Sequence, residues 1–514
     1  MDRTEVLIAG AGPTGLVLAL WLTRLGVPVQ VVDKAAEPGT TSRALAVQAR
    51  TLELYRQLDL ADAVVGRGRR VPGVGLWVKG EQVARVSFEE MGEDLTPYPF
   101  LHIFPQDEHE RLLIGKLAEL GVEVRRGTEL AGFTEAEGRV AAELRGPDGA
   151  SRTVEAGYLA GCDGARSAVR TALAARFPGG TYRQMFYVAD VEAAGPPMDG
   201  RLHIGLDEAD FLAVFPLAGE ARARLIGTVR DDLAGPGATL RFEDVGDRAL
   251  RQLKLQVARV NWFSTYHVHH RVADRFRAGR AFLLGDAAHI HSPAGGQGMN
   301  TGIGDAINLA WKLAAVIGGR APDALLDTYP AERTAFARRL VATTDRVFSF
   351  ATAEGPIAQI LRTRLAPLAA PKALGIEAVR EYLFRTVSQI TLNYRASPLS
   401  RGMAGQVHGG DRLPWAHDGV ADNYASLASP IWQVHLYGEP PAGFAEACAA
   451  RSLRLSVFAW RPAHEAAGLG RGAAYLLRPD TYVALADPAP SAAALDRYAD
   501  AVGIGFAPDP SSLP

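Results

Sequence analysis

The chain has 514 residues and carries 55 lysines and arginines against 57 aspartates and glutamates. Its 48% hydrophobic content excludes a disordered chain, and its formal charge of -2 excludes the strong positive field of a nucleic-acid or anionic-membrane binder. Only two cysteines are present, Cys162 and Cys448, which excludes a disulfide framework or a cysteine zinc module and favours a reducing cytoplasm.

The N-terminal segment predicts a βαβ unit. Residues 5–9 predict a short buried strand, residues 14–25 a helix rich in leucine and alanine, and residues 27–32 a second strand. The uncharged stretch 6–23 has the length of a signal or membrane segment, but glycines and a proline interrupt it and mixed charges precede it. We therefore expect neither export nor membrane insertion.

The pattern then changes twice along the chain. Helices are predicted at 43–58 and 107–120, followed by a strand at 122–125. Strand-like runs separated by turns predict a mostly antiparallel sheet from residues 184–191, 201–206, 211–217 and 222–229. A buried strand at 281–284 and a helix at 302–317 resume the first pattern, so the first domain is predicted to be discontinuous in sequence.

A third unit is predicted after a loop-like stretch at 393–429, which is rich in glycine and proline. Its elements follow a β-α-β-β-α order, with strands at 432–437 and 453–458, a helix at 444–450, a hairpin turning at 478–480, and a helix from 491. We place the first domain at 1–71, 100–180 and 272–393, the middle domain at 72–99 and 181–271, and a linker with the C-terminal domain at 394–514.

A glycine fingerprint lies between the first predicted strand and helix. Gly10-Ala11-Gly12-Pro13-Thr14-Gly15 matches G-x-G-x-x-G, and Asp33 follows 18 residues after Gly15, at the end of the next strand. In this motif the first glycine, Gly10, allows a tight turn, Gly12 allows a diphosphate to approach the backbone, and Gly15 allows the helix to pack closely on the sheet. Asp33 would accept hydrogen bonds from ribose hydroxyls. The pattern predicts a dinucleotide site and leaves NAD or FAD open.

Two further glycine clusters narrow this choice. The first follows an apolar run and reads Gly161-Cys162-Asp163-Gly164-Ala165-Arg166. The second ends another apolar run with Leu284-Gly285-Asp286-Ala287 and continues into Pro293-Ala294-Gly295-Gly296-Gln297-Gly298-Met299-Asn300. In order and approximate spacing, the three clusters resemble those of the class A FAD monooxygenases, the flavoprotein aromatic hydroxylases. The resemblance covers about residues 4–390 and is greatest to the phenol and polyketide hydroxylases.

This resemblance implies an α/β fold: a Rossmann-like FAD-binding domain, a middle, mostly antiparallel β-sheet domain for substrate, and a C-terminal thioredoxin-like α/β domain. The C-terminal segment has no Cys-x-x-Cys, so we interpret residues 430–514 as structural or interface-forming.

The resemblance also implies the cofactor contacts. Asp286 would bind the ribityl chain, backbone N–H groups of residues 298–300 would face the flavin ring, and Asp163 and Arg166 would serve the diphosphate or the reductant. The predicted cofactor-binding residues are Gly10, Gly12, Pro13, Thr14, Gly15, Asp33, Lys34, Arg43, Gln106, Asp163, Gly285, Asp286, Pro293, Gly296, Gly298, Met299 and Asn300.

The predicted substrate pocket lies between the loop at 293–296 and the middle sheet, since ligand sites favour domain interfaces. Its candidate lining residues are Tyr187, Phe211, Ala213, Phe215, Pro216, Pro293, Ala294 and Gly295. Neither His102 nor His291 has a pattern that identifies a catalytic base, so none is assigned. No metal site is predicted, because the histidines at 267–270 lack a completing carboxylate or cysteine.

The family scheme predicts the reaction. NAD(P)H, for which no second fingerprint is present, reduces FAD and leaves, and the reduced flavin captures O2 as a C4a-hydroperoxide that hydroxylates a phenolic or polycyclic aromatic substrate. Three alternatives stay open: a Baeyer-Villiger oxygenase, a flavin dehydrogenase or reductase, and a non-catalytic flavin-binding protein. We expect a cytoplasmic monomer or homodimer with no nucleic-acid or membrane partner.

Overall fold

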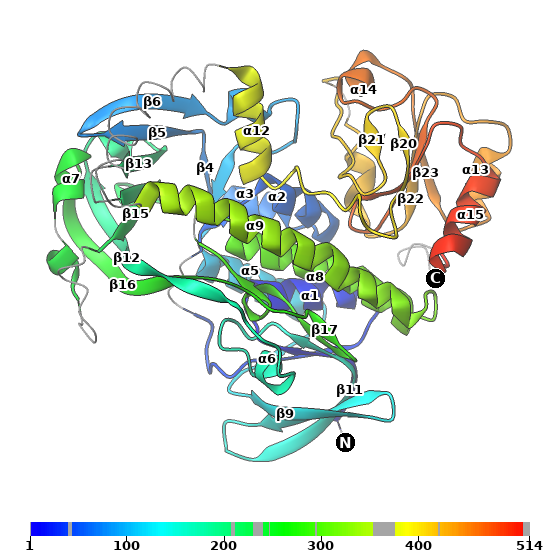
Figure 1. Cartoon of the computed structure of the whole chain (residues 1–514), viewed down its shortest axis with the longest axis horizontal. Coiled ribbons are helices and arrows are strands. Elements are labelled where there is room, and N and C mark those ends of the chain that lie inside the picture. The colour runs from blue at the N-terminus through cyan, green and yellow to red at the C-terminus, as the bar shows by residue number, and fades with distance from the viewer. Residues whose placement is uncertain are drawn as a thin grey trace.

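The computed structural model describes residues 2–39, 44–206, 211–229, 240–245, 247–292, 296–352, 376–419 and 422–506. Their strands form four sheets, and the helices lie around and between them (Figure 1).

The first sheet is a parallel sheet of Rossmann type. Its parallel strands lie in the order β18 (Ala281–Leu283), β11 (Ser151–Gly161), β1 (Asp2–Ala9), β2 (Val29–Val32) and β8 (Val124–Arg125). Antiparallel additions at its edges are β17 (Arg277–Ala278), β9 (Glu129–Ala136) and β10 (Arg139–Arg145).

Long helices pack beside this sheet. Helix α1 (Pro13–Arg24) contacts both α5 (Gln106–Glu119) and α8 (Gly298–Ile317), and α8 also contacts α9 (Thr328–Thr352). Because helices and further strands cover it, β1 is buried from Val6 to Ala9, as is usual for a parallel strand. The predicted βαβ unit and fold class are confirmed.

A small sheet joins the first domain to the middle domain. It has the order β3 (Ala46–Val47), β7 (Leu101–Ile103) and β4 (Arg69–Val71). The helix predicted for 43–58 was wrong at its start: residues 46–47 form a strand with β7, because long-range pairing overrides the local helix propensity. Helical structure there is confined to α2 (Ala49–Tyr55) and η1 (Arg56–Leu58), followed by α3 (Ala61–Arg67).

The middle sheet is mostly antiparallel, as predicted. Its order is β19 (His289–Ile290), β16 (Gln256–Val272), β12 (Gly179–Ala194), β15 (Arg222–Thr228), β14 (Phe211–Pro216), β13 (Leu202–Leu206), β5 (Gly73–Val78) and β6 (Glu81–Ser87). Only β13 and β5 pair in parallel among these described strands. Short helices near the sheet are η2 (Pro196–Met198), η3 (Phe242–Val245), α7 (Arg248–Gln252) and α4 (Glu89–Gly92).

The C-terminal sheet has the order β21 (Val407–His408), β20 (Arg401–Ala404), β25 (Val483–Asp487), β24 (Ala474–Leu477), β22 (Gln433–Tyr437) and β23 (Arg454–Phe458). Its helices are η8 (Ala425–Ala428), α13 (Phe444–Ala449), α14 (Pro462–Ala466) and α15 (Ala492–Val502). The predicted β-α-β-β-α order is present with α14 added, but the stretch predicted as loop contributes β20 and β21. The likeness to thioredoxin stays a prediction.

The remaining described helices link these units: α6 (Ala168–Ala172), η4 (Gly285–Ala287), η6 (Asp323–Asp327) and α12 (Glu377–Val387). Helix α9 begins on the side of the C-terminal unit and runs towards the middle domain (Figure 1). No helix among the described residues is both long enough and apolar enough to cross a membrane.

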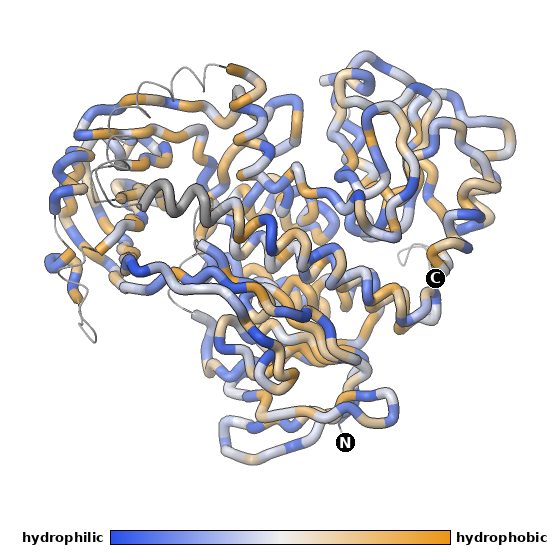
Figure 2. The backbone as a smooth tube through the Cα atoms, viewed as in Figure 1, coloured by the Kyte–Doolittle hydropathy of each residue, from blue (hydrophilic) through white to orange (hydrophobic). Residues whose placement is uncertain are grey.

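The main hydrophobic core extends through two of these units. It fills the space around the parallel sheet, where hydrophobic segments gather in Figure 2, and continues into Val434, Leu436 and Phe444 of the C-terminal unit. The ring of Trp311 on α8 lies 5.7 Å from that of Trp432. The C-terminal unit is therefore packed against the cofactor-domain helix α8 through continuous apolar contacts.

Candidate functional site

The glycine fingerprint forms the turn from β1 into α1, and its glycines differ in their surroundings. Gly10 has φ +105°, and a Cβ there would stand 2.2 Å from the carbonyl oxygen of Cys162. A Cβ on Gly15 would stand 2.0 Å from the oxygen of Gly10. At Gly12, in contrast, no described atom lies within 4 Å of the Cβ position. Gly10 and Gly15 thus permit close packing of α1 and its turn against the neighbouring backbone. Gly12 leaves an open place, a space unfilled by atoms of the described residues, before the first turn of α1.

Helix α1 begins at Pro13, with Gly12 as its N-cap and no side chain capping it. Its first N–H groups have no intrahelical partners, and the helix dipole adds positive potential at this end. A diphosphate supplies the acceptors that such a turn lacks. The residues present therefore fit the dinucleotide that the fingerprint predicts.

Asp33 lies directly beside this turn, after the end of β2. One carboxylate oxygen accepts the N–H of Ala11 at 2.7 Å, and the other accepts the N–H of Ala35 at 2.8 Å. Because a carboxylate has about four acceptor positions, these bonds leave capacity for ribose hydroxyls. Lys34, the next predicted residue, is exposed.

Asp163 follows β11, next to the fingerprint, since the N–H of Cys162 donates to Ala9. Its Oδ2 accepts the N–H groups of Ala168 and Val169 at 2.7 and 3.1 Å, at the start of α6. Its Oδ1 is buried and has no hydrogen-bond partner among the described residues. That oxygen fits a donor from a bound nucleotide, whereas Arg166 is exposed.

The Gly-Asp turn is in contact with the fingerprint through Thr14. Gly285 has φ +57°, and a Cβ there would stand 2.8 Å from the Thr14 hydroxyl. A Cβ on Gly302 of α8 would stand 2.3 Å from the same hydroxyl. The structure therefore brings two distant glycine clusters to one point, with Asp286 exposed on the turn.

Helix α8 begins at Gly298, four residues before the predicted start. Among the described residues, the first amide at this helix start with a backbone partner is that of Thr301, which donates to Gln297 at 2.9 Å. The preceding N–H groups have no intrahelical partners, as in any first helical turn. They belong to Gly298, Met299 and Asn300.

The side chain of Asn300 fixes this helix start to the chain at 46–51. Its Oδ1 accepts the Gln48 N–H at 2.9 Å and the Thr51 hydroxyl at 2.8 Å. Its Nδ2 donates to the carbonyl oxygens of Ala46 and Gly296 at 2.9 and 3.0 Å. Because the side chain is fully used by protein partners, only the backbone of Asn300 is left to face a flavin.

A buried charge group holds the Gly-Asp turn from behind. Asp305 of α8 accepts the Gly285 N–H at 3.0 Å, His289 Nε2 is bonded to it at 2.7 Å, and Arg333 Nε donates to it at 2.5 Å. Burial alone would raise the pKa of Asp305, but the attraction of Arg333 and His289 outweighs it and lowers this pKa. Sequence reasoning missed this group, since its members lie apart along the chain.

Four predicted cofactor or pocket residues, Arg43, Pro293, Ala294 and Gly295, lie outside the described residues. Gln106 begins α5, its N–H donates to Ala44 at 3.1 Å, and its side-chain amide donates to Glu110 at 2.8 Å. It therefore lies beside the segment that Asn300 holds. A Cβ on Gly296 would stand 2.7 Å from that of Ala46.

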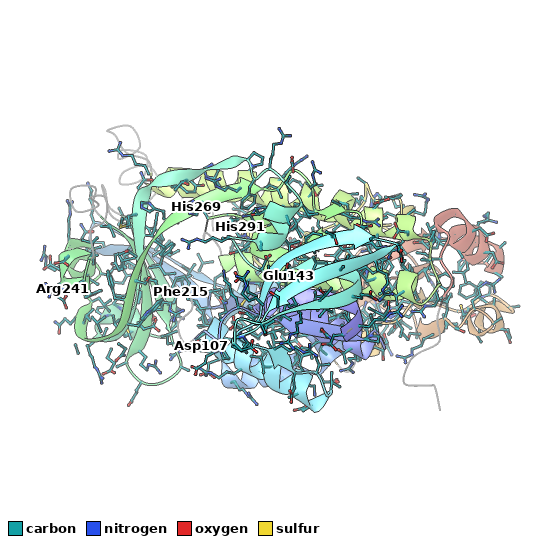
Figure 3. The ribbon with its side chains drawn as sticks, turned by 90° about the horizontal axis from the view of Figure 1, so that it is seen from below. Asp107, Glu143, Phe215, Arg241, His269 and His291 are labelled. Atoms are coloured by element: carbon teal, nitrogen blue, oxygen red, sulfur yellow. The ribbon has the colours of Figure 1, made fainter. Side chains whose placement is uncertain are left out.

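One face of the middle sheet is directed towards this segment. Phe211, Ala213 and Phe215 alternate along β14 and pack in one cluster with Leu45 and Ala46. In Figure 3, Phe215 lies on the middle-domain strands, at the side of the nucleotide-binding elements. The structure thus gathers these three predicted pocket residues near the loop at 296.

Two predicted pocket residues do not share this face. Tyr187 packs against Phe242 and Phe263, in the cluster on the opposite side of the sheet. Pro216 is one residue from Phe215, and successive strand residues point to opposite faces. We therefore withdraw Tyr187 and Pro216 from the pocket.

Two further aromatic residues, which sequence reasoning missed, lie on the same face of the sheet as Phe211 and Phe215. Trp262 and Tyr266 of β16 are half-buried in the cluster of Phe211 and Phe215. Trp262 pairs with Asp190, which binds the buried Arg224 through two hydrogen bonds of 2.6 and 2.8 Å. Residues 262, 264 and 266 alternate along a strand and therefore share one face of the sheet. This alternation is the sequence pattern that could have identified Trp262 and Tyr266.

His291 and His102 each have one buried ring nitrogen without a partner among the described residues, but the two rings lie in different places. Nδ1 of His291 is bonded to the carbonyl oxygen of Ser292 at 2.8 Å, and its buried Nε2 has no partner among the described residues. A Cβ on Gly298 would stand 3.7 Å from this Nε2. Burial lowers the pKa of His291 to about 4, so the ring is neutral at pH 7. His102 is bonded to Val64, away from α8.

Comparisons with known proteins agree with this arrangement. The family model described as "FAD binding domain" matches residues 3–344. The chain is 40% identical over 462 residues to 6-methylpretetramide 4-monooxygenase of Streptomyces rimosus, covering 85% of this chain and 80% of that protein.

Solved structures of aromatic hydroxylases match almost the whole chain. The OxyS anhydrotetracycline hydroxylase from Streptomyces rimosus has a TM-score of 0.77 and 30% identity, covering 99% of this chain and 100% of that one. The ternary complex of aklavinone-11 hydroxylase with FAD and aklavinone has a TM-score of 0.78 and 26% identity, covering 98% and 99%.

Proposed function

The chain belongs to the FAD-binding-domain family of flavin-dependent aromatic monooxygenases, and from this membership we propose that it hydroxylates a polycyclic phenol of polyketide type. The observation that carries the substrate class is the aromatic face of the middle sheet. Phe211, Phe215, Trp262 and Tyr266 lie on it, on the side of the loop at 296. Flat aromatic rings pack well on such side chains.

The names of the relatives support the same class. Those proteins act on 6-methylpretetramide, anhydrotetracycline and aklavinone, as their names state. The net reaction proposed for this chain consumes NAD(P)H, a proton and O2, places one oxygen atom on the ring and releases the other as water.

When bound, FAD supplies the redox chemistry, accepting hydride from NAD(P)H and activating O2. The protein binds and orients it: the open place at Gly12 takes the diphosphate, and Asp33 takes ribose hydroxyls. The first-turn N–H groups of α8 stabilise negative charge on the ring without titrating. The aromatic face holds the substrate ring and excludes water.

His291 is proposed to accept a hydrogen bond at the start of α8. Because Nδ1 is bonded to a carbonyl oxygen, Nδ1 carries the proton and Nε2 has the lone pair. A neutral ring of this tautomer accepts a hydrogen bond from a donor in the site and adds no positive charge beside the flavin.

The function is tested by a panel of phenols and polycyclic quinones. We expect a polycyclic member to stimulate NAD(P)H oxidation and to incorporate one atom from 18O2 as a new hydroxyl. Ring expansion seen by NMR would instead identify a Baeyer-Villiger oxygenase. Substrate oxidation without label in the product would identify a dehydrogenase.

Trp262→Ala is expected to raise KM for the aromatic substrate about tenfold to a hundredfold, because an aromatic contact of about 1–3 kcal/mol is lost. The matched control is Phe263→Ala, since Phe263 is the next residue on β16 and belongs to the opposite cluster. FAD content should be unchanged in both variants. An equal rise of KM in both would contradict the assignment of the pocket face.

Asp286→Ala is expected to weaken FAD binding about tenfold to a hundredfold, because charged hydrogen bonds contribute about 1.5–3 kcal/mol. Asp286 is exposed, so the fold should tolerate the change. Fluorescence titration of apoprotein with FAD measures the effect, and Asp148→Ala on the exposed turn between β10 and β11 serves as control. A wild-type Kd for Asp286→Ala would remove this residue from the site.

A further inference from the structure

The turn between β24 and β25 carries a group of buried polar contacts between the C-terminal unit and the cofactor domain. Arg478 and Asp480 are buried on this turn and are bonded to one another. Arg478 also donates to Glu332 of α9 at 2.7 and 3.1 Å, and Trp311 Nε1 of α8 donates to Asp480 at 3.1 Å. The turn is thus held between α8 and α9.

Arg50 of α2 binds the same turn from the other side. Its Nη2 donates to the carbonyl oxygen of Asp480 at 2.9 Å and to the hydroxyl of Thr481 at 2.8 Å. Its Nη1 donates to Glu53 at 3.1 Å, and its guanidinium lies 4.8 Å from the ring centre of Tyr482. The side chain is 3% exposed, so solvent does not screen these bonds strongly.

The same turn of α2 holds the flavin-facing start of α8. Gln48 and Thr51, on either side of Arg50, donate the two hydrogen bonds that Asn300 Oδ1 accepts. The cavity between Arg50, Asn300 and Tyr482 measures about 20 Å³, barely more than one water needs. Close packing of this kind transmits small displacements.

Thr481 has an unfavourable backbone conformation that its hydroxyl explains. Its φ is +65°, in the left-handed region, where a β-branched residue is strained by about 1–2 kcal/mol and glycine is not. The side chain is buried, and its oxygen accepts from Arg50. The hydroxyl of Thr481 therefore supplies an acceptor for Arg50, although the backbone of Thr481 is strained.

We propose that Arg50 is a positioning residue through which the turn at 478–481 fixes the start of α8, so that the C-terminal unit tunes FAD binding and the flavin potential. Loosening this contact lets Asn300 move, and the backbone donors of α8 then stabilise the reduced flavin less. This inference rests on the FAD site of the proposed function and is independent of the substrate class.

Thr481→Gly separates positioning from stability. Glycine relieves the backbone strain, so we expect Tm to stay close to that of the wild type while the Kd for FAD rises about fivefold to tenfold. This rise is smaller than for a lost charged hydrogen bond to FAD itself, because the lost bond acts on the site only through Asn300. The midpoint potential of the bound flavin should become more negative, since the reduced form loses stabilisation. Both measurements are made without aromatic substrate, so they do not depend on monooxygenase activity.

The matched control is Ser452→Gly. Ser452 also has a left-handed φ, +55°, but it is exposed in the loop before β23. It should leave Kd and potential unchanged. Arg50→Lys keeps the positive charge beside Glu53 but removes the forked guanidinium that donates to several acceptors at once. It should therefore reproduce the effect of Thr481→Gly. Wild-type Kd and potential in both folded variants would overturn the proposal.

Discussion

Gly12→Val is expected to give a folded protein that retains no FAD. Gly12 has an ordinary φ of -76°, and no described atom stands within 4 Å of its Cβ position, so valine fits the apoprotein without strain. The same open place receives the diphosphate at the first turn of α1. Valine therefore excludes the cofactor and leaves the fold intact, raising the Kd about a thousandfold, or about 4 kcal/mol.

Flavin absorbance per mole of purified protein, with far-UV circular dichroism for the fold, measures this result. Gly15→Ala is the informative control, because its Cβ would stand 2.0 Å from the Gly10 oxygen. That variant should lower Tm itself, in contrast to Gly12→Val. A flavin content equal to wild type in Gly12→Val would contradict the assignment of this place to the diphosphate.

The parts of the site that depend on local sequence were predictable. The turn of Gly10, Gly12 and Gly15 follows from neighbouring residues and from the change from strand to helix, as does the turn at Gly285. The family resemblance implied that the two turns belong to one cofactor site, whereas their contact through Thr14 is seen only in the structure. Local patterns thus indicated the turns on which these glycines lie, and the contacts of the cofactor-binding residues with FAD stay a prediction.

The parts that depend on register and on distant partners were not predictable from one sequence. Tyr187 and Phe215 are both large and apolar, and only the pairing of β12 with its neighbours places them on opposite faces. The contacts of Asp305 with Arg333 and of Arg50 with Thr481 join residues far apart along the chain, and no spacing rule connects them. Long-range pairing also turned residues 46–47 into a strand.

Asp305→Leu is expected to destabilise the protein by about 3–5 kcal/mol, because it leaves the guanidinium of Arg333 buried without its carboxylate. The folded-state pKa of Asp305 is below its unfolded value. Its contribution is therefore fully present above about pH 5 and is lost as the pH falls towards the folded-state pKa. The variant should lose this part of the acid sensitivity, measured by urea unfolding from pH 7 downwards.

The double variant Asp305→Leu with Arg333→Met distinguishes the two roles of this carboxylate. Replacing both charges by apolar side chains should restore much of the stability, since no buried ion is then left unpaired. FAD affinity should be low in both the single and the double variant, because in each the N–H of Gly285 and the ring of His289 lack the acceptor that shapes the Gly-Asp turn. If affinity recovered together with stability, Asp305 would support the fold alone, and the turn at Gly285 would need no acceptor behind it.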